Sequence, residues 1–209
     1  MGVMRSRVMV VPRTALFPEG SFQGFLPAGG IDYERRVLGA AGFRERARAE
    51  ISEDCKQPIG YALLVRPRVK TVFAYRRSSR DRDYPERRLQ GKWSWGLGGH
   101  IEESDSPEAN PIRASMLREI FEEVGLKAVR EPLILGYIND DSDPVGRVHF
   151  GLLYLAEAGE TGTLSLSPEL AEGGFYPLEE LERIAADPDA EVEPWSRLSL
   201  PLLHKFRGG

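Results

Sequence analysis

Short hydrophobic runs separated by turn-forming residues recur along the chain and predict β-strands. Residues 59–65 (IGYALLV) form an almost continuous apolar run of strand length. A proline turn separates this run from residues 70–76 (KTVFAYR), which we expect to be its hairpin partner. The same reasoning places further strands at residues 7–11, 93–97, 132–138, 148–156 and 175–176.

The clearest helical pattern covers residues 111–124. Asn110 is a suitable N-cap, and Pro111 fits the first helical position because its missing N–H would have no partner there. Gly125 supplies the left-handed residue that commonly ends a helix. Apolar side chains recur at three- and four-residue spacing and predict one apolar face, made of Ile112, Met116, Leu117, Ile120, Phe121 and Val124.

Helices are also expected in part of residues 31–50, at 178–186 and at 194–206. Strands and helices are mixed without a regular β–α–β alternation. The pattern therefore predicts an α+β fold, a mixed central sheet flanked by helices, rather than a doubly wound parallel sheet. We expect residues 59–209 to form the main domain with its C-terminal helix. Residues 1–58 are expected to form an N-terminal extension packed on or beside it, and an extra strand, a lid or a homodimer contact would all suit this segment.

Composition narrows the class of protein. The chain has 209 residues, of which 41% are hydrophobic and 29% charged, as in an ordinary globular domain. No apolar run approaches the ~18 residues that span a bilayer, so no membrane partner is expected. Nucleic acid is not expected as a partner either, because the net charge is −4. The single cysteine, Cys55, excludes an internal disulfide and a multi-cysteine zinc site, and it favours a cytoplasmic location.

Charge is unevenly distributed, with arginines concentrated in residues 76–88 and carboxylates in 102–123. Within the predicted helix, Glu119 shares a face with Glu122 and Glu123 because residues three and four apart are neighbours. Three carboxylates on one face repel each other unless cations lie among them, and oxygen-only ligands suit Mg²⁺ or Mn²⁺. Taken alone, such a run is more often a solvated charged face.

The context of these carboxylates favours the metal site. A predicted strand ends at Gly98-Gly99, an acidic loop follows, and the helix closes with Gly125 and an apolar residue. The whole stretch, GGHIEESDSPEANPIRASMLREIFEEVGL, resembles the box of the Nudix (MutT-like) hydrolases, including the longer box of a branch described as predicted phosphoesterases. Residues 118–126 match the pattern throughout.

The first half of the box departs from that pattern. Counting from Gly99, the first glutamate of the box falls on Asp105, and the gap from there to Arg118 is five residues longer than in the pattern. The role of this first acidic residue therefore stays open among Glu102, Glu103, Asp105 and Glu108.

The resemblance implies an α/β/α sandwich and a pyrophosphohydrolase that uses water to cleave a small nucleoside diphosphate linked to a further group. Glu119, Glu122 and Glu123 would then be catalytic and would bind Mg²⁺ or Mn²⁺, with Arg118 holding a carboxylate in place. Because Glu122 and Glu123 are expected to face a solvated site, replacing either by Gln should abolish most turnover without loss of the fold.

Substrate contacts and the general base are less defined. Gly98 and Gly99 would place backbone against metal or phosphate, and Arg76 and Arg77 could grip the diphosphate. A solvated loop balanced by nearby carboxylates is an equally good interpretation of these arginines. Two carboxylates before the last strand, Glu169 and Glu172, are candidate bases or surface residues. The three histidines, including His100 and His149, are too scattered for a zinc motif.

Two alternatives share the expected fold. One is an isopentenyl-diphosphate-isomerase-like enzyme, which uses a cysteine, and Cys55 is poorly placed for that role because it precedes the first core strand. The other is a non-catalytic nucleotide-sensing module. Such modules tend to lack the carboxylates, whereas Glu119, Glu122 and Glu123 are all present here, which favours catalysis.

Overall fold

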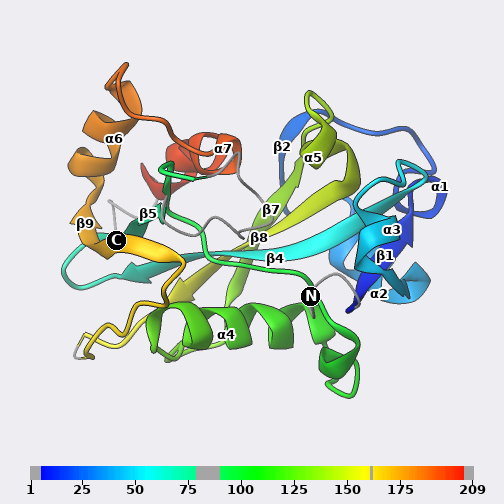
Figure 1. Cartoon of the computed structure of the whole chain (residues 1–209), viewed down its shortest axis with the longest axis horizontal. Coiled ribbons are helices and arrows are strands. Elements are labelled where there is room, and N and C mark those ends of the chain that lie inside the picture. The colour runs from blue at the N-terminus through cyan, green and yellow to red at the C-terminus, as the bar shows by residue number, and fades with distance from the viewer. Residues whose placement is uncertain (1–5, 79–89, 161, 205–209) are drawn as a thin grey trace. The chain divides into compact units, whose positions relative to one another are not determined.

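The computed structural model describes residues 6–78, 90–160 and 162–204, and Figure 1 shows its strands and helices. They belong to two compact units, each made of segments far apart in the sequence. The first unit draws on Met1–Tyr61, Gly98–Arg118 and Leu133–Tyr154, and the second on Ala62–Leu97, Glu119–Pro132 and Leu155–Gly209. Three elements pass from one unit into the other: strand β4 (Cys55–Arg66), helix α4 (Pro111–Val124) and strand β8 (His149–Glu157).

The sheet of the first unit has the strand order β2-β7-β8-β4-β1-β3. Strand β2 (Gly24–Pro27) pairs antiparallel with β7 (Leu133–Asn139), and β1 (Arg7–Pro12) pairs antiparallel with β3 (Gly42–Glu45). The unit also contains the short elements α1 (Arg13–Leu16), α2 (Tyr33–Ala40), α3 (Arg46–Ala49), η3 (Glu103–Asp105) and α5 (Pro144–Val148).

In the second unit, strand β5 (Thr71–Arg77) is the centre of the pairing. It pairs with the end of β4, with β6 (Trp93–Ser94) and along its length with β9 (Leu170–Pro177). The C-terminal helices are α6 (Leu178–Ala186) and α7 (Pro194–Leu203). Trp95 is fully buried and its indole N–H donates to the Ser196 carbonyl at 2.7 Å, which fastens the residues after β6 to α7.

Strand β4 is buried along almost its whole length, with its last residue, Arg66, as the partly exposed end. A strand buried on both faces needs a near-continuous apolar run, and residues 59–65 provide it. Gly60 is required by packing, because a Cβ there would lie 2.9 Å from the Cβ of Met116 in α4. The predicted hairpin of β4 and β5 is confirmed, with Val65 opposite Val72.

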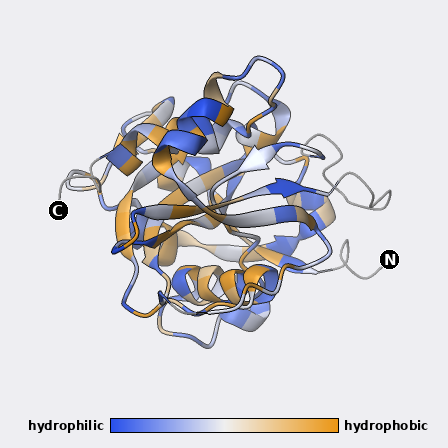
Figure 2. Cartoon of the chain, turned by 90° about the vertical axis from the view of Figure 1, so that its left-hand side faces the viewer, coloured by the Kyte–Doolittle hydropathy of each residue, from blue (hydrophilic) through white to orange (hydrophobic). Residues whose placement is uncertain are grey.

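Helix α4 begins and ends as the sequence predicts. The Asn110 side chain accepts from the Arg113 N–H, and Gly125 has a φ of +72°. Figure 2 shows both hydrophobic and hydrophilic residues on the turns of this helix, at the bottom of the view. The predicted apolar face is partly wrong, because Leu117 is 37% exposed and Phe121 52% exposed. The buried stripe is narrower and follows a four-residue repeat: Ile112, Met116, Ile120 and Val124.

The predicted α+β class with a mixed sheet and flanking helices is confirmed. The region before residue 50 is more structured than expected, because α1 and β2 lie between residues 11 and 31, where no element was predicted, and β3 lies within the segment expected to be partly helical. These short elements are held by distant partners, as β2 is by β7, rather than by a local pattern. In the described part of the chain, no helix combines the length and the apolar character needed to cross a membrane.

Candidate active site

The last turns of α4 lie in the second unit and carry the three glutamates of the box. Glu119 is half-buried and Glu122 is exposed, whereas Glu123 is 7% exposed. The expectation that Glu123 faces solvent is therefore wrong. The spacing could have shown this, because Glu123 comes three residues after Ile120 and seven after Met116, both on the buried stripe of the helix.

The Glu123 carboxyl group lies in an environment that disfavours a lone negative charge. Burial raises its pKa to about 8, and the charges of three further carboxylates, Glu119, Glu169 and Glu193, raise it as well, while Arg77 acts in the opposite direction. Its Oε2 atom is buried and has no hydrogen-bond partner within the described residues. A buried carboxylate oxygen without a donor is a site where a cation would be stabilised.

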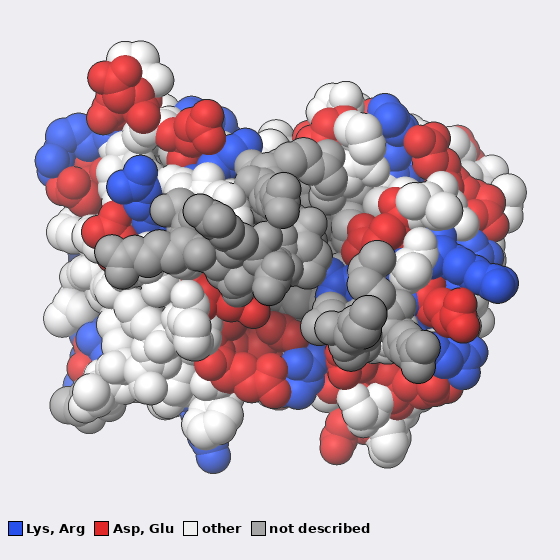
Figure 3. Space-filling model, in the orientation of Figure 1, with Lys and Arg blue, Asp and Glu red and all other residues white. Residues whose placement is uncertain are grey.

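Acidic side chains gather on the surface over the middle of α4, as the red patch in Figure 3 shows. Oxygen donors of this kind are what hard divalent cations prefer. The buried oxygen of Glu123, together with the neighbouring carboxylates, therefore fits a metal ion of the Mg²⁺ or Mn²⁺ type.

Arg77, predicted to grip a diphosphate, is committed to the protein interior. It is 9% exposed, its Nε donates to Glu193 Oε1 at 2.6 Å, and its guanidinium lies 5.4 Å from the centre of the Tyr75 ring. Its neighbour Arg76 is exposed and donates from Nε to the Gly91 carbonyl at 2.8 Å. The other arginines of the predicted positive loop, Arg80, Arg82, Arg87 and Arg88, lie outside the described residues.

The two candidate bases lie in different surroundings. Glu169 is exposed in the turn before β9 and is close enough to Glu123 to affect its pKa. The chain before it runs past the end of α4, because the Ser167 N–H donates to the Glu123 carbonyl at 2.8 Å. Glu172 is on β9 opposite Arg76, at 3.9 Å from its guanidinium. Of the two candidates, Glu169 is therefore the one whose charge acts on Glu123, and a role as the base stays a prediction for both.

In the first unit, Arg118 pairs with Asp105, one of the four candidates for the first acidic residue of the box. Its Nε and Nη2 each lie 3.1 Å from a different oxygen of Asp105, and Asp105 is 6% exposed. A bidentate pair of this kind fixes both side chains. Asp105 also accepts from the Glu102 N–H, which closes the turn of η3. Asp105 is the residue that counting from Gly99 places at the first glutamate of the box. It contacts Arg118 even though the box is five residues longer than the pattern.

Gly98 is required by close packing. A Cβ at this position would lie 2.3 Å from the Gly60 carbonyl oxygen of β4. This contact accounts for Gly98 without any contact to a ligand. The residues that follow continue along β4, where His100 forms an antiparallel bridge with Ile59.

The structure brings together two histidines that the sequence leaves unconnected. His100 and His149 face each other with their Nε2 atoms 3.2 Å apart, and Glu50 lies beside them. The three residues are each about fifty positions apart, so no local pattern in the sequence connects them. For this reason the sequence does not point to Glu50. All three residues belong to the first unit.

Cys55 is unsuited to nucleophilic chemistry. It is 2% exposed, and burial raises the pKa of its thiol, with Arg44 acting in the opposite direction. A buried thiol with a raised pKa contributes little thiolate at neutral pH. This argues against an isomerase-like role for the cysteine.

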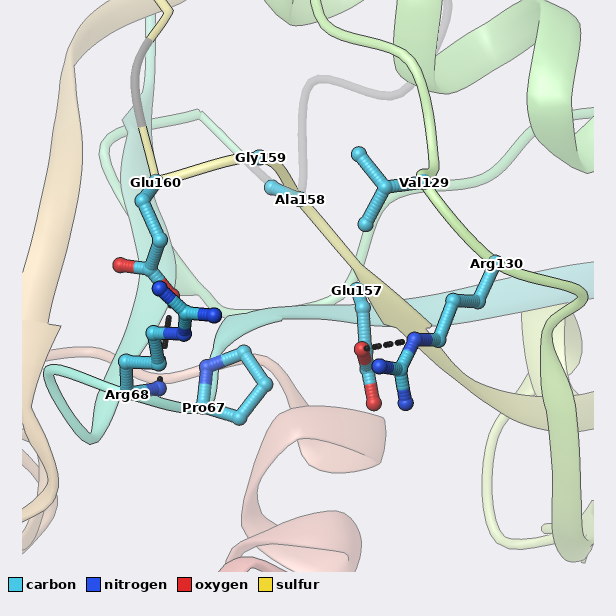
Figure 4. A pocket seen from close by; sticks show the side chains of 8 residues that line it. All are labelled: Pro67, Arg68, Val129, Arg130, Glu157, Ala158, Gly159 and Glu160. Atoms are coloured by element: carbon cyan, nitrogen blue, oxygen red, sulfur yellow. Dashed lines mark hydrogen bonds and ion pairs between the residues drawn. The ribbon is translucent and has the colours of Figure 1, made fainter.

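One pocket of about 420 Å³ lies in the second unit between the turn after β4 and the end of β8 (Figure 4). Among its charged residues, Arg130 lies 3.4 Å from Glu157, and the Glu160 carboxylate accepts from the backbone N–H of Arg68 at 3.4 Å. None of the described site candidates is among its lining residues. This pocket is therefore lined by residues other than the carboxylates of α4.

Comparison with known proteins identifies the class. A sequence model of the NUDIX domain matches residues 56–196. Protein YmaB of Bacillus subtilis (strain 168) is 31% identical over 212 residues, which cover 97% of this chain and all of that protein.

Two solved structures agree. The crystal structure of Tm1382, a proposed Nudix hydrolase, has a TM-score of 0.75 and 30% identity and covers 95% of this chain and 98% of its own. A NUDIX hydrolase from Alicyclobacillus acidocaldarius has a TM-score of 0.56 and 17% identity, covering 71% of this chain and 90% of its own, and shows the shared fold alone.

The chain therefore belongs to the NUDIX family, as the resemblance of residues 98–126 predicted. Membership implies hydrolase activity on small nucleotide derivatives, and enzymes of this family generally use divalent metal ions.

Proposed function

We propose that the chain is a metal-dependent pyrophosphohydrolase that cleaves the diphosphate linkage of a small nucleoside diphosphate derivative. The observation that carries this proposal is the buried Glu123 carboxylate, whose Oε2 lacks a hydrogen-bond partner in the described part of the chain and which lies near Glu119, Glu169 and Glu193. Leaving a buried charge unpaired costs several kcal/mol, on the order of 3–5. A bound Mg²⁺ or Mn²⁺ ion would remove that cost.

In this proposal Glu119, Glu122 and Glu123 hold the ion. When bound, the ion would neutralise phosphate oxygens and lower the pKa of a water molecule. Glu169, exposed and close to Glu123, would accept the proton of the attacking water. Glu172 is the second candidate for this task, although its carboxylate faces Arg76.

The remaining predicted residues receive separate roles. Arg76 is exposed and stays a candidate for binding the diphosphate, and Gly99 stays a candidate for a backbone contact with phosphate. Arg77 and Arg118 are assigned to positioning, since each is paired with a buried carboxylate. We also propose a cytoplasmic location and no binding to nucleic acid or membranes, on the strength of the net charge of −4 and the single cysteine.

The test is a substrate panel assayed with and without Mg²⁺ or Mn²⁺. It should include nucleotide sugars, ADP-ribose, NADH, dinucleoside polyphosphates, coenzyme A and nucleoside triphosphates. We expect metal-dependent turnover of at least one of them, and a loss of about 100-fold or more in kcat for Glu119→Gln, Glu122→Gln and Glu123→Gln, because each removes a charged oxygen ligand of the metal. Glu131→Gln, at an exposed position after α4, is the matched control and should retain activity.

Two results would reject the proposal. Full activity in all three glutamine variants would show that these glutamates do not bind the catalytic ion. Tight nucleotide binding without turnover of any compound, with or without metal, would instead identify a nucleotide-sensing module.

A further inference from the structure

A second group of side chains that could bind a metal lies in the first unit. Unlike the three glutamates of the box, it contains two histidines. Glu50 directly follows α3, His100 follows the two glycines before the acidic loop, and His149 is the first residue of β8. One ligand atom from each of the three residues lies within 4.8 Å of the other two. Three segments that are about fifty residues apart therefore converge on one point.

The distances match those around a bound ion. His100 Nε2 lies 3.2 Å from His149 Nε2 and 3.4 Å from Glu50 Oε1. Two ligand atoms that are each 2.0–2.1 Å from a tetrahedral zinc ion are about 3.3–3.4 Å apart. We propose that Glu50, His100 and His149 bind a divalent transition-metal ion of the zinc type.

The identity of the ligands sets the class of metal. Imidazole nitrogen suits Zn²⁺ and its transition-metal neighbours, whereas Mg²⁺ prefers oxygen ligands only. Two histidines and one glutamate are a donor set found in catalytic zinc sites, which keep the fourth position for water or a substrate oxygen. The ion at this site is therefore chemically distinct from the Mg²⁺ or Mn²⁺ proposed at Glu119, Glu122 and Glu123.

Neighbouring groups hold the ligands in a metal-binding orientation. The Nδ1–H of His149 donates to the Val145 carbonyl at 2.9 Å, so the proton is on Nδ1 and the lone pair of the neutral ring is on Nε2. The carbonyl of His100 accepts from Ser115 Oγ at 3.2 Å and from Arg118 Nη2 at 3.3 Å. Arg46 donates to the Glu50 carboxylate at 3.2 Å, one helical turn away. The His149 ring is thus fixed on the side away from His100, and His100 is fixed through its backbone. Glu50 is held by Arg46 at Oε1, the same oxygen that faces His100.

Burial of the group protects such a site without closing it. His149 is 5% exposed and the His100 side chain 10% exposed, while the Glu50 side chain is 29% exposed. The carboxylate side therefore gives an ion a way in from solvent. Without an ion, the short nitrogen–nitrogen contact requires a single N–H···N hydrogen bond from His100 to His149, which is the competing explanation.

Metal titration of the full chain separates the two explanations. The purified protein is stripped with a chelator, returned to Mg²⁺-saturated buffer so that oxygen-only sites are filled, and titrated with Zn²⁺ by calorimetry and with Co²⁺ by visible absorption. We expect one equivalent to bind, with a Co²⁺ spectrum of a nitrogen-containing, four-coordinate site. His100→Ala and Glu50→Gln should each weaken binding by more than the roughly 100-fold that loss of an outer-shell partner costs.

The controls address the other metal-binding groups. His204→Ala replaces a histidine of the second unit, 46% exposed and paired with Glu182, and should bind as the wild type does. The Glu119→Gln and Glu122→Gln variants should also retain the Co²⁺ site, so failure of the proposed hydrolase would not affect this result. Absence of Zn²⁺ binding by the wild type, or unchanged binding in both His100→Ala and Glu50→Gln, would overturn the proposal in favour of a hydrogen-bonded histidine pair.

Discussion

Glu123 shows how a single side chain can be poorly suited to the metal-free fold and well suited to the metal-bound one. Its carboxyl group is 7% exposed and surrounded by the charges of other carboxylates, and burial raises its pKa. Because this pKa is above neutral, the metal-free fold must protonate a carboxyl group that is ionised in the unfolded chain, which costs stability at neutral pH. Replacing Glu123 by glutamine, which is neutral in both states, avoids that cost. The same substitution removes a ligand of the proposed Mg²⁺ ion. Stability in the two conditions should therefore respond in opposite directions.

We predict that Glu123→Gln is at least as stable as the wild type in chelator-treated buffer at neutral pH. Added Mg²⁺ should stabilise the wild type, by about 2.7 kcal/mol at a hundredfold excess over Kd, and should stabilise the variant far less. Thermal denaturation with and without Mg²⁺ measures both effects, with Glu131→Gln at an exposed position as the control that should follow the wild type. An equal Mg²⁺-induced rise in Tm for wild type and Glu123→Gln would show that Glu123 does not bind the ion.

At the scale of the elements, the segment after β6 can follow β4 closely only because two glycines face each other. A Cβ on Gly98 would lie 2.3 Å from the Gly60 carbonyl, a distance that no side chain can occupy without moving the backbone. We predict that Gly98→Ala destabilises the fold by about 1–3 kcal/mol or more, as overpacking of a core does. Urea denaturation measures this. Gly30→Ala, where an added Cβ meets no atom within 4 Å, should leave stability nearly unchanged, and equal effects of the two would refute the packing argument.

The elements that the sequence predicts well are those whose signals are local. Helix α4 has a capping asparagine, a first-turn proline and a terminal glycine, and its observed bounds follow them. The width of its buried face was overestimated, because the spacing of six apolar residues does not show which of them lie at the edge of the face. Leu117 and Phe121 lie at that edge and are exposed to solvent. Short strands such as β2 and β3 have no signal of their own, since distant strands hold them.

The same distinction applies to the candidate site. The glutamates of the box follow from spacing along one helix, whereas the choice of Asp105 as the partner of Arg118 depends on how the extra residues before the helix are folded. The group of Glu50, His100 and His149 depends wholly on contacts between distant segments. No periodicity or spacing in the sequence could have joined them.

At the scale of the whole molecule, the chain builds each unit from several separated segments. The first unit joins Met1–Tyr61 to Gly98–Arg118 and Leu133–Tyr154. The predicted boundary between an extension at 1–58 and a domain at 59–209 stays a prediction. Within the first unit, a charged cluster connects two of these segments: Arg13 and Lys56 of the first segment both bind Asp141 of Leu133–Tyr154, at 2.5 and 2.6 Å.

This cluster should make the first unit sensitive to acid. Lys56 is fully buried, and its Nζ also donates to the Gly146 carbonyl at 2.6 Å, so Asp141 is the carboxylate that compensates its charge. Burial alone would raise the pKa of Asp141, but hydrogen bonds from Arg13 and Lys56 lower it from 3.8 to about 2. Because the pKa of Asp141 is lower in the fold than in the unfolded chain, the carboxylate stabilises the fold at pH values above its unfolded pKa. This contribution is lost as pH falls from about 5 through 2.

We therefore predict that Asp141→Asn destabilises the protein by on the order of 3 kcal/mol at pH 7, because it leaves a buried ammonium group without its partner. The difference from the wild type should persist down to about pH 5 and shrink steadily below pH 4, where the wild-type carboxylate itself gains a proton. Denaturation measured across this pH range provides the test, and Asp189→Asn in an exposed turn is the matched control. A difference that stays constant down to pH 2 would mean that Asp141 acts through its shape and hydrogen bonds rather than through its charge.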